Sequence, residues 1–324
     1  MNAPFCLIAV VCALGLAAAC SHPKTRPYER GDALRYMPTA CSVARVYADV
    51  AGWSLSFPSG SLTSSTSHSG RLKHVLEAFE SSGIHVGQDL WELAICIDAL
   101  PQDADDLSSA VAVIGGRLGG ASALKKYEAV IRALTNAKPG EIVESRRSGY
   151  PYLVGIHQKD RVWIAMPAPD VLLFSTGPVT QLDTLKRADD PDLGAWRAKL
   201  GTLAGFEYVS PERATGGLVA HGTVSTRGSD LEMDVDARFG SLVGLDATKL
   251  GVIRSGLSSL LQASALSPLA GPVQRTDLEV SDGTLRVAFR VSPAELEDTV
   301  TRVRAEPHAL ADLIARATSA ASTR

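Results

Sequence analysis

The clearest pattern along the chain is a strict alternation of apolar and polar residues in its second half. Over 231–239, every odd position is apolar and every even position is charged. This period of two predicts an antiparallel strand with one buried face, paired with the preceding run at 217–226. A second hairpin is predicted where Asp282-Gly283 separates strands at 274–281 and 284–291.

The rest of the chain alternates between short strand patterns and helical patterns. Strands are expected at 42–50, 90–98, 108–116, 141–147, 150–156, 161–167 and 171–175. Apolar residues that recur every three or four positions predict helices at 71–83, 121–136, 179–187, 192–204, 246–265, 293–304 and 308–320. In "SPAE", Ser292 fits an N-cap, Pro293 the first helical position and Glu295 the partner that reaches back, which predicts a capping box.

These elements predict an α+β fold, with mostly antiparallel sheets and helices packed on one face. Their order reads ββαββββα over 90–204 and ββαββα over 216–304, which favours two related units. We expect four parts in the chain: a signal peptide at 1–19, a flexible polar tether at 20–36, an N-terminal α+β unit at 37–205 and a C-terminal α+β unit at 206–324.

The N-terminal 19 residues carry no charged side chain. Their apolar part, 5–16, is about 12 residues long, whereas a membrane-spanning helix needs about 20. An apolar run of this length followed by small residues is the pattern of a signal peptide. Here the small residues of "LAAAC" end on Cys20, and polar sequence follows at once.

This stretch, residues 1–21, resembles the signal peptide and lipobox of bacterial lipoproteins. The resemblance implies that the chain is cleaved before Cys20, that its thiol is acylated and that the lipid holds the protein on a membrane. Ser21 resembles the residue found in lipoproteins sent to the outer membrane, which favours that membrane over the inner one. Two features depart from the pattern, because Ala17 stands where leucine is usual and no Lys or Arg precedes the apolar run. A plain secretory signal and a buried N-terminal helix are the alternatives.

The cysteines agree with export. Cys6 and Cys12 lie in the signal peptide and Cys20 would carry the lipid, which leaves Cys41 and Cys96. Each of these two falls opposite the apolar face of its expected strand, so they could meet across neighbouring strands. A disulfide is expected in an oxidising compartment. Two unpaired, half-buried thiols are the alternative.

Bulk composition excludes one class of partner. The 324 residues are 45% apolar and 21% charged, as in ordinary globular proteins. A net charge of −3 offers no basic surface for nucleic acid, and only 6% of the residues are aromatic. We therefore expect no nucleic-acid partner.

Two motifs invite a catalytic or cofactor interpretation. The run "VAVIGGRLGGASAL" at 111–124 suggests a dinucleotide-binding turn, but Arg117 occupies the position where a glycine must admit the pyrophosphate. Ser122 and Lys125 match S-x-x-K, but the K-T-G strand of penicillin-binding proteins is missing. The histidines and the acidic run at 103–106 lack the spacing of metal ligands. No catalytic residue, cofactor or metal is predicted.

One loop carries large apolar residues. Trp53, Leu55 and Phe57 alternate within 51–70, where eight of twenty residues are serine. They either pack into the core or form a lip that contacts the membrane or an apolar ligand. The leading hypothesis is a non-enzymatic lipoprotein, anchored through Cys20, that acts as a binding or structural module for an unidentified envelope partner. A carrier of lipid or another apolar ligand is the first alternative, and an envelope hydrolase is the second.

Overall fold

The computed structural model shows two compact units, whose described residues lie before and after Leu200. The described residues are 29–38, 41–56, 77–98, 110–119, 121–135, 137–138, 140–157, 160–185, 195–209, 219–238, 247–262 and 267–305. The unit boundary falls five residues before the one expected at 205, because a strand begins soon after it. The helix expected over 192–204 was wrong, because in the described part of that range only 195–197 is helical. Strand β8 (Ala204–Val209), to which the sequence pattern assigned no element beyond 204, begins where that helix was expected to end.

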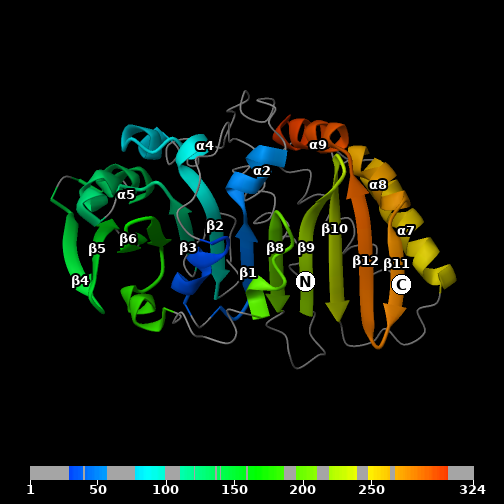
Figure 1. Cartoon of the computed structure of the whole chain (residues 1–324), viewed down its shortest axis with the longest axis horizontal. Coiled ribbons are helices and arrows are strands. Elements are labelled where there is room, and N and C mark those ends of the chain that lie inside the picture. The colour runs from blue at the N-terminus through cyan, green and yellow to red at the C-terminus, as the bar shows by residue number, and fades with distance from the viewer. Residues whose placement is uncertain are drawn as a thin grey trace. The chain divides into compact units, whose positions relative to one another are not determined.

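The N-terminal unit is built on an antiparallel sheet with the strand order β1-β2-β3-β7-β6-β5-β4 (Figure 1). Its strands are β1 (Ala44–Ala48), β2 (Leu90–Ile97), β3 (Ala110–Gly116), β4 (Ile142–Arg147), β5 (Tyr150–His157), β6 (Asp160–Ala168) and β7 (Val171–Ser175). Every strand expected in this half of the chain is present. Their antiparallel pairing and the mixture with helices confirm the α+β class.

One face of this sheet carries a row of residues that are fully shielded from solvent. The row crosses five strands and consists of Tyr47, Ala94, Val113, Leu173 and Ala165, all with exposed fractions of 0%. Short helical segments cover it, namely the 3-10 helices η1 (Asp32–Tyr36) and η4 (Val179–Thr184) and the turn at 196–200. A central sheet with a buried row of this kind supplies most of the apolar burial in a domain.

The other face is covered by α5 (Glu128–Thr135), which follows the 3-10 helix η3 (Ala121–Tyr127). Gly155 on β5 lies directly beneath Ile131 of α5, and a side chain at that glycine would collide with the isoleucine. Gly155 and the row of buried residues point to opposite faces, since side chains alternate along a strand. The sheet of this unit therefore has a helical cover on both faces.

Two expectations about the N-terminal unit were wrong. Residues 32–36, assigned to the flexible tether, form η1, in which Ala33 and Leu34 are buried. Residues 51–56, assigned to a loop, belong to helix α2 (Val50–Ser56), which packs against β2. Asp49 caps α2 by accepting a hydrogen bond from Gly52 N at 2.9 Å, a cap that the serine-rich composition obscured.

The C-terminal unit has an antiparallel sheet of order β11-β12-β10-β9-β8. Its remaining strands are β9 (Val219–Arg227), β10 (Asp230–Arg238), β11 (Asp277–Ser281) and β12 (Thr284–Val291). The helices are α7 (Ala247–Gln262), η6 (Ser267–Leu269), α8 (Ala270–Gln274) and α9 (Pro293–Ala305). The predicted hairpins β9–β10 and β11–β12 are confirmed, and β10 buries Leu231 and Ala237 while exposing Asp236 and Arg238.

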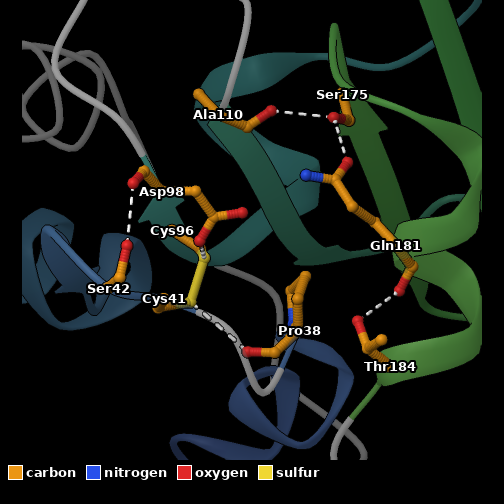
Figure 2. The surroundings of a disulfide bond; sticks show 9 residues. All are labelled: Pro38, Cys41, Ser42, Cys96, Asp98, Ala110, Ser175, Gln181 and Thr184. Atoms are coloured by element: carbon orange, nitrogen blue, oxygen red, sulfur yellow. Dashed lines mark hydrogen bonds between the residues drawn. A yellow bond between two sulfur atoms is a disulfide. The ribbon is translucent and has the colours of Figure 1, made fainter.

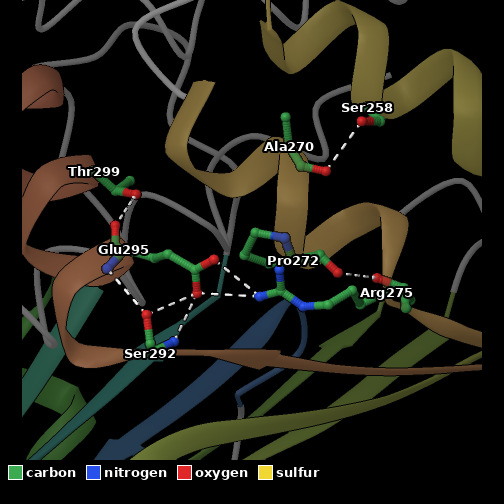
Figure 3. A network of polar contacts seen from close by, with 8 residues as sticks. Ser258, Ala270, Pro272, Arg275, Ser292, Glu295 and Thr299 are labelled. Carbon is green, nitrogen blue, oxygen red and sulfur yellow. Dashed lines mark hydrogen bonds and ion pairs between the residues drawn. The ribbon is translucent and has the colours of Figure 1, made fainter.

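The predicted capping box at the start of α9 is also confirmed (Figure 3). Ser292 N donates to Glu295 Oε2 at 2.9 Å, and Glu295 N donates back to Ser292 Oγ at 3.3 Å. Arg275, which follows α8, adds an ion pair to Glu295 at 2.9 Å. The network therefore ties the end of α8 to the beginning of α9.

We expect Ser292→Ala to lower the free energy of unfolding by about 1 kcal/mol, as for other lost N-caps.

Burial raises the pKa of Glu295, but hydrogen bonds from Ser292 and Arg275 outweigh it and leave the pKa below its ordinary value. A lowered pKa in the folded state stabilises the protein above the ordinary value and loses that contribution as the pH falls through the folded-state pKa. Urea unfolding of wild type and of Glu295→Gln at neutral and acidic pH measures this contribution of Glu295 to stability. The difference between the two should shrink at acidic pH, and a constant difference would contradict it.

Candidate functional site

The segment that follows the predicted tether is fastened to the body by a buried carboxylate. Glu92 on β2 has an exposed fraction of 0%. Its Oε1 accepts a hydrogen bond from Ala33 N at 3.0 Å, and its Oε2 accepts from Gly31 N at 2.8 Å and from the Tyr47 hydroxyl at 2.8 Å. An ionised carboxylate offers only acceptors, so three converging donors match it. The same segment supplies two of those donors from its main chain.

Ion pairs on either side of this carboxylate strengthen the attachment. Arg30 Nε donates to Asp49 Oδ2 at 2.8 Å, and the Arg30 guanidinium carbon lies 5.2 Å from the centre of the Tyr47 ring. Asp32 forms an ion pair with Arg197, from the turn that covers the same face of the sheet. We call this group the Glu92 clasp; it comprises Glu92, Tyr47, Arg30, Asp49, Asp32 and Arg197.

Within the clasp, the Tyr47 hydroxyl and the Glu92 carboxyl group are bonded to each other. Burial, followed by the charge of Glu92, raises the pKa of the Tyr47 hydroxyl far above its ordinary value, so this group stays a hydrogen-bond donor. Three hydrogen bonds to Glu92 come from N–H and O–H groups of the chain itself. The arrangement therefore attaches the segment to the sheet, because two of these donors belong to its main chain.

The sequence of β2 contains an indication that Glu92 is buried, but the alternation of the strand suggests that this face meets water. In β2, Trp91, Leu93 and Ile95 mark one apolar face, which places Glu92 on the face that usually meets water. Ala94 and Cys96 share that second face with Glu92, and both have exposed fractions of 0%. Small apolar neighbours around a lone charge indicate a strand buried on both sides, as in a central strand.

The predicted disulfide between Cys41 and Cys96 is present, on the same face of β2 as the clasp (Figure 2). Cys96 is fully buried, and Cys41 lies just before β1 with its Sγ 3.3 Å from Pro38 O. Ser42 Oγ donates to Asp98 O at 2.8 Å, beside the bridge. The bond therefore joins the end of the clasped segment to β2, a strand with a neighbour on each side.

The sulfurs of Cys41 and Cys96 and a carboxylate oxygen of Asp98 lie within 4.8 Å of one another. Burial raises the pKa of Asp98, opposed by hydrogen bonds from Ser42 and Gln181. In the described part of the chain this is the group whose atoms lie close enough to ligate a metal ion. Both sulfurs are used in the disulfide, and the thiolate is the form that binds metals, so the group is a structural bridge.

The remaining predicted site residues are placed only in part. Trp53 lies in α2 with an exposed fraction of 1%, so it is a core residue. The side chain of Leu55, the whole of Phe57 and the proposed lipid site Cys20 lie outside the described residues. A contact of Leu55 and Phe57 with membrane or apolar ligand stays a prediction.

The glycine-rich run has a packing role. Gly116 ends β3 where the backbone of Asp89 approaches so closely that any side chain would collide with it. Arg117 N donates to Asp89 O at 2.6 Å, which fixes this approach. Lys125 of the S-x-x-K match lies at the surface, with its Nζ 3.8 Å from Glu144. The side chain of Ser122 lies outside the described residues.

Among the described residues, no helix combines the length and the hydropathy needed to cross a membrane. Comparison with protein-family models finds no match, and comparison with curated proteins finds none either. The chain is similar to a solved structure of TP0453 in crystal form III, with 10% identity and a TM-score of 0.45, over 82% of this chain and 96% of that one. It is also similar to TP0453 in crystal form I, with 10% identity and a TM-score of 0.40, over 85% of this chain and 97% of that one.

Proposed function

We propose that this protein is a lipid-anchored module of the cell envelope, attached through Cys20, that binds or supports other envelope components without catalysing a reaction. The observation that carries the proposal is the Glu92 clasp. Chain termini usually fray, whereas here a fully buried carboxyl group holds the segment that begins at Gly31. Such a fixed point suits a body attached by its N-terminal end, because it transmits force on the tether to β2, a strand inside the sheet.

The length of the tether agrees with this role. The described chain begins at Glu29, nine residues after Cys20. Gly31, the first residue that donates to Glu92, follows Cys20 by eleven residues. A fully extended chain spans about 3.3–3.6 Å per residue, so the anchor would keep Gly31 within about 40 Å of the lipid attachment. The body would then work close to the membrane surface.

The disulfide supports the same compartment. Disulfides persist in oxidising environments such as the bacterial periplasm and are rare in the cytosol. Cys41 and Cys96 are the two cysteines that remain if Cys20 carries lipid and the two before it are removed with the signal peptide. Signal peptide, anchor and disulfide together would account for all five cysteines of the chain.

We expect Cys20→Ser to release the protein from the membrane fraction and to abolish its acylation. Wild-type protein should sediment with membranes, and its intact mass should show a chain that starts at Cys20 with added acyl groups. The mass should rise by two hydrogens on reduction. Cys12→Ser is the matched control, because it changes a cysteine inside the signal peptide and should leave anchoring unchanged.

Two results would contradict the proposal. One is a Cys20→Ser protein that stays in the membrane fraction and still carries the added acyl mass. The other is wild-type protein that is unmodified and full length. Solvent extraction of the same wild-type preparation separates a structural or binding module from a carrier, since a carrier should yield lipid in a constant ratio to protein.

A further inference from the structure

The outer strand β4 has one strand neighbour among the described residues. It pairs with β5 from Ile142 to Arg147 and ends the strand order of the N-terminal sheet, as Figure 1 shows at the left of the view. Half of the main-chain donors and acceptors of such a strand point away from the sheet. An exposed edge of this kind is a template for pairing with another strand.

The side chains of β4 do not block such pairing. Its sequence, IVESRR, contains no proline and no glycine. Val143 is 55% exposed, and Ile156 on the neighbouring strand is 50% exposed. Val143 pairs with Val154, two residues before Ile156, so both exposed side chains lie on one face of the sheet. Large apolar side chains are thus left in water beside an open edge.

The charges of β4 select its partner. Glu144 and Arg146 point to the same face, two positions apart, with opposite signs. If two identical strands run antiparallel about an axis through Ser145, Glu144 of each lies opposite Arg146 of the other. Symmetry then produces two ion pairs for one register. Cross-strand pairs of opposite charge stabilise a sheet, and like charges destabilise it.

Other registers are less favourable. An axis through Glu144 places the two Glu144 side chains opposite each other, and an axis through Arg146 does the same for arginine. A register that sets position 144 opposite position 147 brings no charged pair together, because Glu144 and Arg147 lie on opposite faces of the sheet. Among the described residues, the ion pair given to Glu144 is with the exposed Lys125 at 3.8 Å, a contact worth little in water.

We propose that β4 pairs antiparallel with β4 of a second copy of this chain, centred on Ser145, and so joins two N-terminal sheets into one. In this register Val143 lies opposite Arg147, whose aliphatic stem can cover it. The interface is a single strand of six residues on each side, so the dimer is weak and reversible. This inference does not depend on the lipid anchor.

Sedimentation velocity of the full chain in mild detergent tests the proposal. Wild type should convert from monomer to dimer as its concentration rises. Glu144→Arg and Arg146→Glu should each weaken association about 30-fold, because each replaces two attractive pairs by two repulsive ones. The double variant exchanges the charges and should restore wild-type association. It also lacks the contact with Lys125, so recovery cannot come from that contact.

Cysteine cross-linking tests the register. With oxidised glutathione, Ser145→Cys should form a covalent dimer, because position 145 faces itself across the axis. Val143→Cys is the matched control on the same strand and should cross-link far less. Wild type that stays monomeric, a double variant that fails to recover, or equal cross-linking at both positions would overturn the proposal.

Discussion

Replacing Glu92 by alanine is expected to lower the free energy of unfolding by about 3–5 kcal/mol, because three buried hydrogen-bond donors lose their acceptor. The substitution leaves the main-chain donors of Gly31 and Ala33 and the hydroxyl of Tyr47 buried without this acceptor. Each donor that is buried without an acceptor destabilises the folded state by the free energy of removing it from water. Urea unfolding followed by circular dichroism measures the change.

Two variants calibrate this result. Tyr47→Phe removes one of the three donors and should cost about 1 kcal/mol. Glu297→Ala changes an exposed glutamate of α9 and should stay within about 0.5 kcal/mol of wild type. A Glu92→Ala protein as stable as Glu297→Ala would show that Glu92 does not hold the segment.

A proteolysis measurement separates the clasp from general stability. Trypsin should cut after Arg30 and Arg35 faster in Glu92→Ala than in wild type under native conditions, because the segment detaches before the body unfolds. Leu250→Ala, a buried residue of the C-terminal unit, supplies a destabilised control. Equal cutting at Arg30 and Arg35 in the two variants would contradict a local clasp.

Removal of the disulfide is the second large effect. The bond links residues 55 positions apart, and the chain-entropy model assigns a loop of that length about 4 kcal/mol. The double variant Cys41→Ala/Cys96→Ala should lose about that much free energy of unfolding. Alanine avoids a new buried hydroxyl at Cys96, whose exposed fraction is 0%.

Reductant provides the control for the disulfide. Dithiothreitol should lower the stability of wild type towards that of the double variant and leave the double variant unchanged. Wild type that is insensitive to reductant, with both thiols free to react, would show that the bond does not form in the protein.

The local features of this fold were predictable because their causes lie within a few residues. Alternation over 231–239 and the turn at Asp282-Gly283 sufficed for the hairpins of the C-terminal unit. The capping box at Ser292 needs only its own four residues, since the side chain of Glu295 reaches back one turn. Strand parity also brought Cys41 and Cys96 to the right faces.

Features that depend on distant residues were missed. The helical state of 51–56 rests on the Asp49 cap and on burial of Trp53 beside β2, which outweigh a serine-rich composition. Strand β8 was not predicted, because it is stabilised by pairing with β9, a segment that its own sequence does not identify. Tertiary contacts override local propensity where a segment is short.

The sequence by itself determined the class of fold, the two hairpins of the C-terminal unit, the capping box and the pairing of the two body cysteines. The tertiary structure alone decided that β2 is buried on both faces, and with it the role of Glu92. The reason is physical: alternation reports that one face of a strand meets water, but only the residues that fold over that face decide whether it does. Here Ala33, Leu34 and Trp196 cover it, from segments up to about 100 residues away. A glutamate that looks solvated in the sequence thereby becomes the point to which the N-terminal segment is attached.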